Sequence, residues 1–403
     1  MEISNKQFMR MFALALLVST ACAQADQDWS QQARELTQRY PLIDTHVDVP
    51  YRLNESWQDV TVATQTGDFD YPRAVAGGLD IPFMSIYTPG GLKSTARNYQ
   101  LANQLIDGVE ALVGRAPAKF MQVRSTRDVA VAMEKGLIGL AMGMENGSPI
   151  NGDLENISHF ARRGIRYITL AHSHSNDISD SSFDTARPNG GLSDFGREVV
   201  TEMNRVGVMV DVSHLSDEAI RDVLEVSAVP VIASHSSARK FTPGFERNLS
   251  DELILAIAEN GGVVHINFGS AFIIPEANKL LNDFRVARDA YLEEHDFEPG
   301  GEEDAAYRAE FLQNVKFVYA TTAQVADHVE HVIGLTGIEH VGIGSDYDGV
   351  GPTLPVGLKD VSQYPNLVAE LLARGYGEED IAKLLGGNLL RAWRAAEAFA
   401  ESR

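Results

Sequence analysis

The stretch Leu42-Ile43-Asp44-Thr45-His46-Val47-Asp48 is an apolar run that leads into a histidine and an aspartate two residues apart. On an extended strand, residues i and i+2 point to the same side. The end of one strand therefore presents an imidazole nitrogen and a carboxylate oxygen, which are zinc-type ligands, to the same point in space. Taken alone, this pair also fits a strand end with incidental polar residues. The rest of the chain must therefore decide between a metal site and this simpler interpretation.

Seven further apolar, β-rich runs follow along the chain and alternate with amphipathic helical patterns. We predict strands at 41–48, 79–87, 137–144, 165–171, 207–212, 230–234, 261–267 and 339–346. We predict helices at 95–113, 153–163, 194–206, 216–226, 249–259 and 313–334. Eight strands separated by helices indicate an α/β fold of the (β/α)8 TIM-type barrel class. The alternative, an open doubly wound sheet, would be favoured by a glycine-rich phosphate fingerprint after the first strand, and none is present.

The predicted barrel occupies nearly the whole chain of 403 residues, because no proline-, glycine- or serine-rich linker divides it. We expect residues 26–403 to form one catalytic domain. Residues 172–193 are rich in Ser, Asp, Asn and Gly and predict a long functional loop, and residues 273–312 predict an acidic, partly helical insertion. The largely helical tail at 359–402 is expected to cover the outside of the barrel.

The first 25 residues have the pattern of a secretory signal peptide. Lys6 and Arg10 precede the apolar run MFALALLV at 11–18, which is too short for a transmembrane helix, and small residues follow it. The sequence around Cys22, the only cysteine, also resembles a bacterial lipoprotein signal, although Ser19 stands where leucine is usual. We therefore expect an exported protein, either periplasmic or held at the cell envelope by a lipid anchor at Cys22, with no transmembrane span.

The net charge of −22, from 34 basic and 56 acidic residues, bears on the partners of the chain. Such a surface repels phosphate backbones, so we expect no nucleic-acid partner. The charge favours solubility and carries no information about the fold.

Chemically active side chains follow six of the eight predicted strands. His46 and Asp48 end the first strand, Glu145 the third, His172 the fourth, His214 the fifth, His235 the sixth and Asp346 the eighth. Barrel enzymes build their sites at these carboxyl ends. Separate strand-end caps explain six such positions poorly, so the pattern predicts a metal site.

The number of these ligands bears on how many metal ions are bound. The candidate metal ligands are His46, Asp48, Glu145, His214 and His235. One catalytic zinc takes three protein ligands, so five fit two ions better, with one carboxylate bridging them. Such a pair of ions can activate a shared hydroxide and polarise a scissile carbonyl.

The chain resembles the membrane dipeptidase (renal dipeptidase) family of zinc peptidases. The resembling segments are DTHVD at 44–48, GMENG at 143–147, RYITLAH at 166–172, DVSH at 211–214, SHSSA at 234–238, RN at 247–248 and GSDYDG at 344–349. They occur in the family's order and extend over nearly all of the chain after residue 25.

The resemblance implies a metal-dependent hydrolase that cleaves dipeptides, including those with a C-terminal D-residue, at a centre of two zinc ions. His46 and Asp48 would bind one ion, His214 and His235 the other, and Glu145 would bridge them. His172 would steady the oxyanion, Arg247 would hold the substrate carboxylate, and Asp346 would act as general acid/base. Arginine suits carboxylate recognition, and a carboxyl group near the metals can protonate the leaving amine. A homodimer is also implied.

Several assignments have alternatives. A surface ion pair of Arg247 with Glu246 or Asp251 competes with substrate contact, Asp348 competes with Asp346, and His174 competes with His172. The loop at 172–193 borders the pocket and lacks the Cys and Trp often found there in animal relatives, which leaves side-chain preference open. Animal members also have disulfides and a glycolipid anchor, neither of which carries over to this chain.

Other histidines are interpreted as structural. His328 and His331, flanked by acidic residues, indicate a solvated helix face, and His265 indicates a satisfied core residue within the seventh strand.

Two further function classes compete with the dipeptidase. One is an N-acyl amino acid deacylase or lactone hydrolase on the same metal barrel, since barrels host many chemistries. The other is a non-catalytic envelope binding protein, which would require a broken site, whereas every expected ligand is present.

Overall fold

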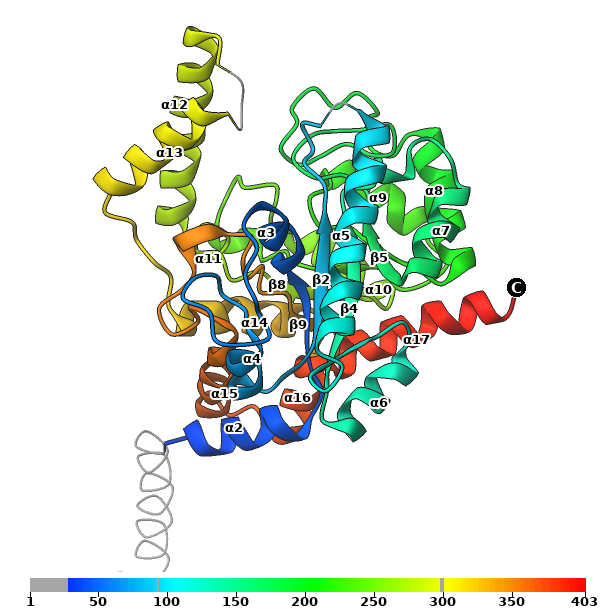
Figure 1. Cartoon of the computed structure of the whole chain (residues 1–403), viewed down its shortest axis with the longest axis vertical. Helices are drawn as coiled ribbons and strands as arrows, with labels where there is room; N and C mark the ends of the chain where they lie inside the picture. Colours follow the sequence, from blue (N-terminus) through cyan, green and yellow to red (C-terminus); the bar gives the residue numbers. More distant parts are fainter. Residues whose placement is uncertain (1–27, 93, 298–300) are drawn as a thin grey trace, which may run out of the picture.

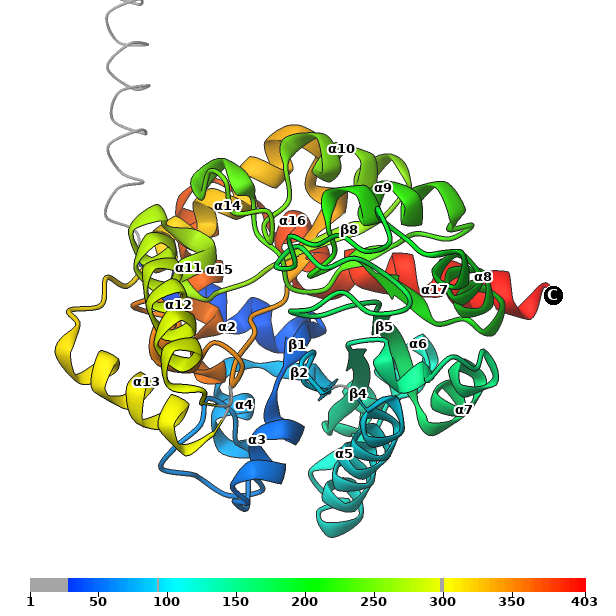
Figure 2. The same cartoon turned by 90° about the horizontal axis from the view of Figure 1, so that it is seen from above.

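The computed structural model describes residues 28–92, 94–297 and 301–403, and its centre is a closed ring of eight parallel strands (Figure 1, Figure 2). In ring order these are β1 (Leu42–Val47), β2 (Leu79–Tyr87), β4 (Ile138–Glu145), β5 (Ile165–Thr169), β6 (Met209–Asp211), β7 (Ile232–Ala233), β8 (Val263–Ile266) and β9 (Val341–Ile343), which pairs with β1. A short strand, β3 (Phe120–Gln122), pairs with the start of β4 beside this ring. The TIM-type barrel predicted from the sequence is confirmed.

Helices surround this ring (Figure 2). They are α2 (Ser30–Arg39), α3 (Val49–Glu55), α4 (Tyr71–Gly77), α5 (Thr95–Arg115), α6 (Thr126–Lys135), α7 (Glu155–Arg163), α8 (Asp194–Val206), α9 (Asp217–Val226), α10 (Asp251–Glu259), α11 (Ser270–Ile273), α12 (Pro275–His295), α13 (Glu302–Asn314), α14 (Thr322–Thr336), α15 (Tyr364–Ala373), α16 (Glu378–Ala382) and α17 (Asn388–Glu401). The single helix predicted at 313–334 is wrong at its start. There, α13 ends at Asn314, and α14 begins only after Thr321, whose side chain forms a capping box with Gln324.

The predicted insertion at 273–312 contains α12 and α13, which form an antiparallel pair that stands above α11 in Figure 1. Aromatic contacts join the two helices: the rings of Phe284 and Phe311 are 4.3 Å apart, and those of Tyr291 and Tyr307 are 4.7 Å apart. Stacked and tilted aromatic pairs of this kind add specific geometry to apolar burial. The pair therefore projects from the barrel as a unit with its own side-chain packing.

The sequence predicted that the helical tail covers the outside of the barrel. In the structure, the tail also contributes a buried side chain to the barrel interior. Trp393 in α17 is fully buried, and its ring lies 5.5 Å from that of Phe83 in β2. Both belong to one apolar cluster with Ile43, Ile81 and Tyr167, which are strand residues. The last helix thus closes one end of the barrel interior and leaves the carboxyl ends of the strands for a site.

The structure bears on one part of the localisation prediction, the absence of a transmembrane span. Among the described residues, no helix combines the length and apolar character needed to cross a bilayer. The predicted signal peptide and Cys22 lie outside the described residues.

Candidate functional site

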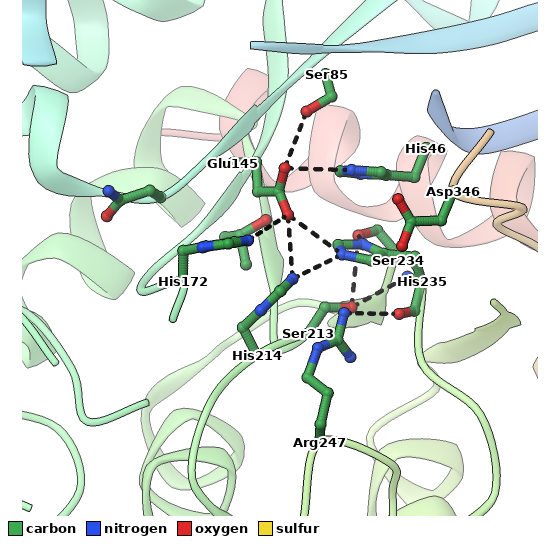
Figure 3. Close-up of polar contacts among 12 residues, drawn as sticks. His46, Ser85, Glu145, His172, Ser213, His214, Ser234, His235, Arg247 and Asp346 are labelled. Carbon is green, nitrogen blue, oxygen red and sulfur yellow. Dashed lines mark hydrogen bonds and ion pairs between the residues drawn. The ribbon is translucent and has the colours of Figure 1, made fainter. Parts of the chain in front are cut away.

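Histidine and acidic side chains converge at the carboxyl ends of the strands (Figure 3). Three sets of donor atoms could each hold a metal ion, with all atoms of a set within 4.8 Å of one another. They are His46, Glu145 and His235; Glu145, His172 and His214; and His46, Asp48 and Asp346. All five residues predicted as metal ligands belong to these sets, which overlap in one continuous cluster.

Glu145 lies between two parts of this cluster. Its Oε2 is 3.3 Å from Nε2 of His46 and accepts a hydrogen bond of 3.1 Å from Ser85. Its Oε1 is 3.0 Å from Nε2 of His214, 3.4 Å from that of His235 and 3.3 Å from that of His172. Burial opposes ionisation, but the adjacent imidazoles, with His46 first, hold the pKa of Glu145 well below its usual range. The two oxygens of one carboxylate therefore face different groups of imidazoles.

The tautomer of His46 follows from a hydrogen-bond chain. The hydroxyl of Tyr167 donates to the carbonyl of Thr45 at 2.8 Å, so its oxygen accepts from Nδ1 of His46 at 2.9 Å. The opposite nitrogen, Nε2, is buried, has no hydrogen-bond partner among the described residues, and faces Asp48 at 3.4 Å and Glu145 at 3.3 Å. Although burial lowers the pKa of His46, Tyr167 and these two carboxylates raise it well above its usual value. The position thus favours a positive charge beside Nε2.

A glycine makes the contact between Tyr167 and His46 feasible. A Cβ atom at Gly143 in β4 would lie 1.9 Å from the Tyr167 ring. The absence of a side chain at Gly143 therefore lets the Tyr167 ring cross the barrel interior and reach His46.

His235 is oriented by a second chain of hydrogen bonds. Ser234 donates its hydroxyl proton to Asp211 at 2.6 Å, so its oxygen accepts from Nδ1 of His235 at 2.7 Å. Asp211 also accepts the backbone N–H groups of Ser213 at 3.0 Å and Ser234 at 2.8 Å, which ties the end of β6 to the end of β7. Nε2 of His235 is left facing Nε2 of His214 at 2.9 Å.

These donors fit a metal ion. Burial, reinforced by nearby Arg247, lowers the pKa of both His214 and His235 well below the usual value, so both are neutral, the form that binds metal. The unpartnered Nε2 of His46, the facing Nε2 atoms of His214 and His235, and the carboxylates between them form a set of nitrogen and oxygen donors suited to zinc-type metals.

Asp346 lies at the edge of the cluster on a left-handed turn, with φ of 63°. Its backbone N–H donates to the His46 carbonyl at 3.1 Å, and Asn267 donates to its Oδ2 at 2.7 Å. Burial and the charge of Asp48 raise the pKa of Asp346 well above its usual value. A carboxyl group that retains its proton in this way can deliver it to a leaving group.

The competing aspartate, Asp348, has a different environment. Arg52 pairs with its Oδ2 at 2.9 Å, and the backbone N–H of Asp68 donates to its Oδ1 at 2.6 Å. Asp348 belongs to none of the three donor sets and anchors the loop after β9.

Of the two competing histidines, His172 belongs to the metal-ligand cluster and His174 does not. Nε2 of His172 lies 3.3 Å from Glu145, and its ring lies edge-on to Tyr87 at 4.9 Å. His174 borders the cavity and belongs to none of the donor sets.

Arg247 is buried, with 2% of its surface exposed. It donates to the Ser236 hydroxyl at 2.7 Å and to the His235 carbonyl at 2.9 Å, and its Nε has no hydrogen-bond partner among the residues that the structure describes. Within the described part of the chain, no carboxylate lies within ion-pair distance of it. Burial lowers its pKa to about 10, so it is cationic at neutral pH. A buried cation without an anion is costly, and a substrate carboxylate would supply one.

The alternative prediction, that Arg247 forms a surface ion pair with Glu246 or Asp251, is wrong. Glu246 pairs with Arg187 and accepts the backbone N–H of Asp217 at 3.0 Å, while Asp251 pairs with His331 at 2.7 Å.

A cavity of about 890 Å³ opens over the cluster. Its walls include Tyr51, Tyr87, Ser173, His174, Phe183, Phe272, Leu281, Arg285 and Val286 around Asp48, Glu145, His172, His214 and Asp346. The 172–193 loop borders the cavity, as predicted. Arg247 does not line this cavity. Its guanidinium lies 5.2 Å from the ring of Phe272, and Phe272 is one of the residues that line the cavity.

Sequence reasoning missed the residues that orient the cluster, which are Ser85, Tyr167, Asp211, Ser234 and Asn267. Three of them, Tyr167, Asp211 and Ser234, lie in the segments RYITLAH, DVSH and SHSSA, so their position one to five residues from a candidate histidine was the available signal.

The prediction that His328 and His331 lie on a solvated helix face is wrong for both residues. His331 has only 10% of its side chain exposed and lies 2.7 Å from Asp251. His328 is not on a solvated face: it is fully buried, bonds the Ile273 carbonyl through Nε2 and accepts the Ala238 N–H. His265 is buried in β8 as expected. Its Nδ1 contacts the Ala233 carbonyl at 3.0 Å, and its Nε2 has no hydrogen-bond partner in the described part of the chain.

Comparisons with known proteins agree with this geometry. The model of the family described as membrane dipeptidase (peptidase family M19) matches residues 30–403. The probable dipeptidase PvdM from Pseudomonas aeruginosa is 29% identical with a TM-score of 0.80, over 92% of this chain and 99% of that one. A metallopeptidase from Rhodobacter sphaeroides, solved with a phosphinate mimic of L-Ala-D-Ala, is 25% identical with a TM-score of 0.73, over 89% and 99% of the two chains. Dipeptidase AC, a metallopeptidase of family M19, is also 25% identical with a TM-score of 0.73, over 89% of this chain and 98% of that one.

Proposed function

The chain belongs to the membrane dipeptidase family of metal-dependent peptidases, and we propose that it hydrolyses dipeptides at a centre of two zinc ions. The observation that carries this proposal is the position of Glu145, whose Oε2 faces His46 and whose Oε1 faces His214. A carboxylate between two groups of donors is the arrangement that a bridged pair of metal ions needs.

In this proposal His46 and Asp48 would hold one ion, His214 and His235 would hold the other, and Glu145 would contribute to both sites. The 2.9 Å separation of the two Nε2 atoms supports the pairing of His214 with His235. His235 also stacks on His46 with ring centres 3.7 Å apart, so the two halves of the centre are contiguous. When bound, the ions would supply an activated water and polarise the scissile carbonyl.

The protein's own groups would hold the substrate and move the proton. Arg247, a buried cation without a carboxylate partner among the described residues, would attract the free C-terminal carboxylate. His172, with its Nε2 directed at Glu145, would donate to the oxyanion that forms at the scissile carbonyl. Asp346 would carry the proton to the leaving amine.

We also propose that C-terminal D-residues are accepted. Support comes from the Rhodobacter sphaeroides metallopeptidase, which was solved with a mimic of L-Ala-D-Ala.

The test is a panel of L,L and L,D dipeptides, each paired with its N-acetylated form, with zinc quantified in the same preparation. We expect cleavage of the free dipeptides. A strong preference for the acetylated forms would replace this proposal by a deacylase, and bound zinc without turnover of any amide or ester would replace it by a binding protein.

The cellular placement is a separate proposal that rests on the sequence. Residues 1–25 would direct export, and the mature chain, a single domain from about residue 26, would be periplasmic or lipid-anchored at Cys22. Mass spectrometry of the mature N-terminus distinguishes the two outcomes. The implied homodimer is tested by the mass of the protein in solution.

A further inference from the structure

The turn at 346–349, directly after β9, carries two aspartates, and only the first of them has a role in the proposed reaction. Asp346 and Asp348 both have a left-handed backbone, with φ of 63° and 67°. Residues other than glycine are uncommon in this conformation and keep it where the surrounding structure holds them there. Two such residues in one turn therefore require contacts that hold the turn in place.

The turn packs closely against the metal-ligand cluster. The backbone N–H of Asp346 donates to the His46 carbonyl at 3.1 Å, and that of Asp48 donates to the Tyr347 carbonyl at 2.8 Å. A Cβ atom at Gly349 would lie 2.1 Å from Oδ1 of Asp346 and 2.2 Å from Oδ2 of Asp48. Because the turn passes this close to both carboxylates, a small displacement of its backbone would move the Asp346 carboxyl relative to the cluster.

Asp348 provides the contacts that hold the turn from the other side. Its side chain is 2% exposed, and its Oδ2 pairs with Nε of Arg52 at 2.9 Å. Its Oδ1 accepts the backbone N–H of Asp68 at 2.6 Å, and its own N–H donates to Oδ2 of Asp68 at 2.8 Å. One residue thus joins the turn to α3 and to the segment before α4, which are both about 280 residues away in the sequence.

Arg52 links this contact to a proposed metal ligand. It lies in α3, the helix that begins directly after Asp48, and its backbone N–H donates to the Asp48 carbonyl at 3.2 Å. The remaining guanidinium nitrogens donate to the Gln58 side chain at 3.1 Å and to the Phe69 carbonyl at 3.0 Å. The guanidinium is therefore fixed by neighbours on several sides, and its pair with Asp348 joins the helix after one ligand to the turn that carries the proposed acid.

We propose that Asp348 is a positioning residue: held by Arg52 and Asp68, it keeps the Asp346 carboxyl in the place from which a proton reaches the leaving amine. This inference rests on the dipeptidase function and on the role of Asp346 proposed above. Asp348 belongs to none of the three donor sets, so it acts on the reaction through Asp346. A reacting group displaced by about 1 Å can cost about 100-fold in rate.

The test begins with Asp348→Asn, which keeps the size of the side chain and the acceptor for the Asp68 N–H but removes the ion pair with Arg52. In the zinc-loaded protein, we expect kcat for L-Ala-L-Ala to fall about 10- to 100-fold, with KM and bound zinc unchanged. Arg52→Gln removes the same ion pair from its other side and should lower kcat in the same way. Arg52→Lys keeps a cation there and should restore part of the loss.

The measurement specific to this role is the double variant that combines Asp348→Asn with Asp346→Asn. Once the carboxyl group that Asp348 positions is gone, removal of the Asp348 charge should have no further effect on kcat, so the double variant should match Asp346→Asn alone. A further loss of tenfold or more would show that Asp348 acts independently of Asp346, and would overturn the proposal.

The matched control is Asp70→Asn. Asp70 is also buried and pairs with Arg73 at 2.8 Å, and within the described ranges it has no hydrogen bond or ion pair to the turn. Its kcat should equal that of the wild type. Equal losses of kcat in Asp70→Asn and Asp348→Asn, or a loss in Asp348→Asn that lower bound zinc explains, would overturn the positioning role alone. A zinc-loaded wild type that does not cleave dipeptides would contradict the dipeptidase function as well.

Discussion

The Nε2 atoms of His214 and His235 lie 2.9 Å apart in a buried pocket. Both imidazoles are neutral because burial lowers their pKa values. Ser234 accepts from Nδ1 of His235, so Nε2 of His235 carries a lone pair rather than a proton. Two such nitrogens at this distance either share one proton or direct their lone pairs at one cation, and the adjacent Glu145 carboxylate favours the cation.

The first prediction concerns the hydroxyl that orients His235. Ser234→Ala removes the acceptor for Nδ1 and should weaken zinc binding about 10- to 100-fold, the effect usual for loss of a hydrogen bond that orients a metal-ligating histidine. The measurement is competition between the metal-free protein and a chromophoric chelator. Ser227→Ala, which removes a hydroxyl that donates to the Val229 carbonyl away from the cluster, is the control. Equal zinc affinity in both variants would mean that the Ser234 hydroxyl does not orient a ligand.

The second prediction concerns Arg247. Arg247→Met should raise KM for dipeptides about tenfold or more, because a charge-assisted contact with the substrate carboxylate is lost, and should change kcat less. The readout specific to this role is a comparison of a dipeptide with its C-terminal amide. The wild type should prefer the free carboxylate and the variant should not. An unchanged KM would show that the assigned role is wrong.

The third prediction concerns Asp346. Asp346→Asn keeps the size of the side chain but removes the proton-carrying carboxyl, and should lower kcat about 10²- to 10⁴-fold. The zinc content of the variant, measured on the same sample, separates loss of proton transfer from loss of metal. A variant with full zinc and full kcat would exclude Asp346 as the general acid.

The fourth prediction concerns pH and stability at Asp80, which lies away from the cluster. Its carboxylate accepts the Leu42 N–H at 2.9 Å, and burial raises the pKa of Asp80 to about 7. A raised carboxyl pKa adds stability at pH values below the unfolded pKa of about 4, and this contribution is lost as pH rises through about 7.

Asp80→Asn keeps the acceptor and removes the ionisation. Its free energy of unfolding relative to the wild type should therefore increase by about 1–3 kcal/mol from pH 5 to pH 8 in urea titrations. Asp107→Asn, at a position with 69% of its side chain exposed, should show no comparable change. A pH-independent difference for Asp80→Asn would contradict the expected shift.

The strand ends were predictable from the sequence because each buried parallel strand is a continuous apolar run. Each such run ends at or near a candidate ligand, namely His46, Glu145, His214 or His235. Because the carboxyl ends of all barrel strands lie on one face, the fold class was enough to predict that these residues lie together. The short β3 at 120–122 and α6 at 126–135 were missed, because no element was assigned between the helix predicted at 95–113 and the strand predicted at 137–144.

Contacts across the barrel could not be predicted. Tyr167 orients His46 from 121 residues away, and the contact depends on the missing side chain of Gly143. The burial of His328 was missed for a similar reason, because its partners, Ala238 in a loop and Ile273 at the end of α11, are distant in the sequence. Tertiary packing decides these positions, and no local pattern reports it.

The most direct test of the two-metal centre is titration of the metal-free protein with zinc while bound zinc and dipeptide hydrolysis are followed on the same sample. The position of Glu145 between His46 and His214 predicts that activity rises to a plateau at about two equivalents of zinc per chain. It also predicts that Glu145→Gln fails to reach this stoichiometry. A plateau at one equivalent, or hydrolysis by the metal-free protein, would contradict the account.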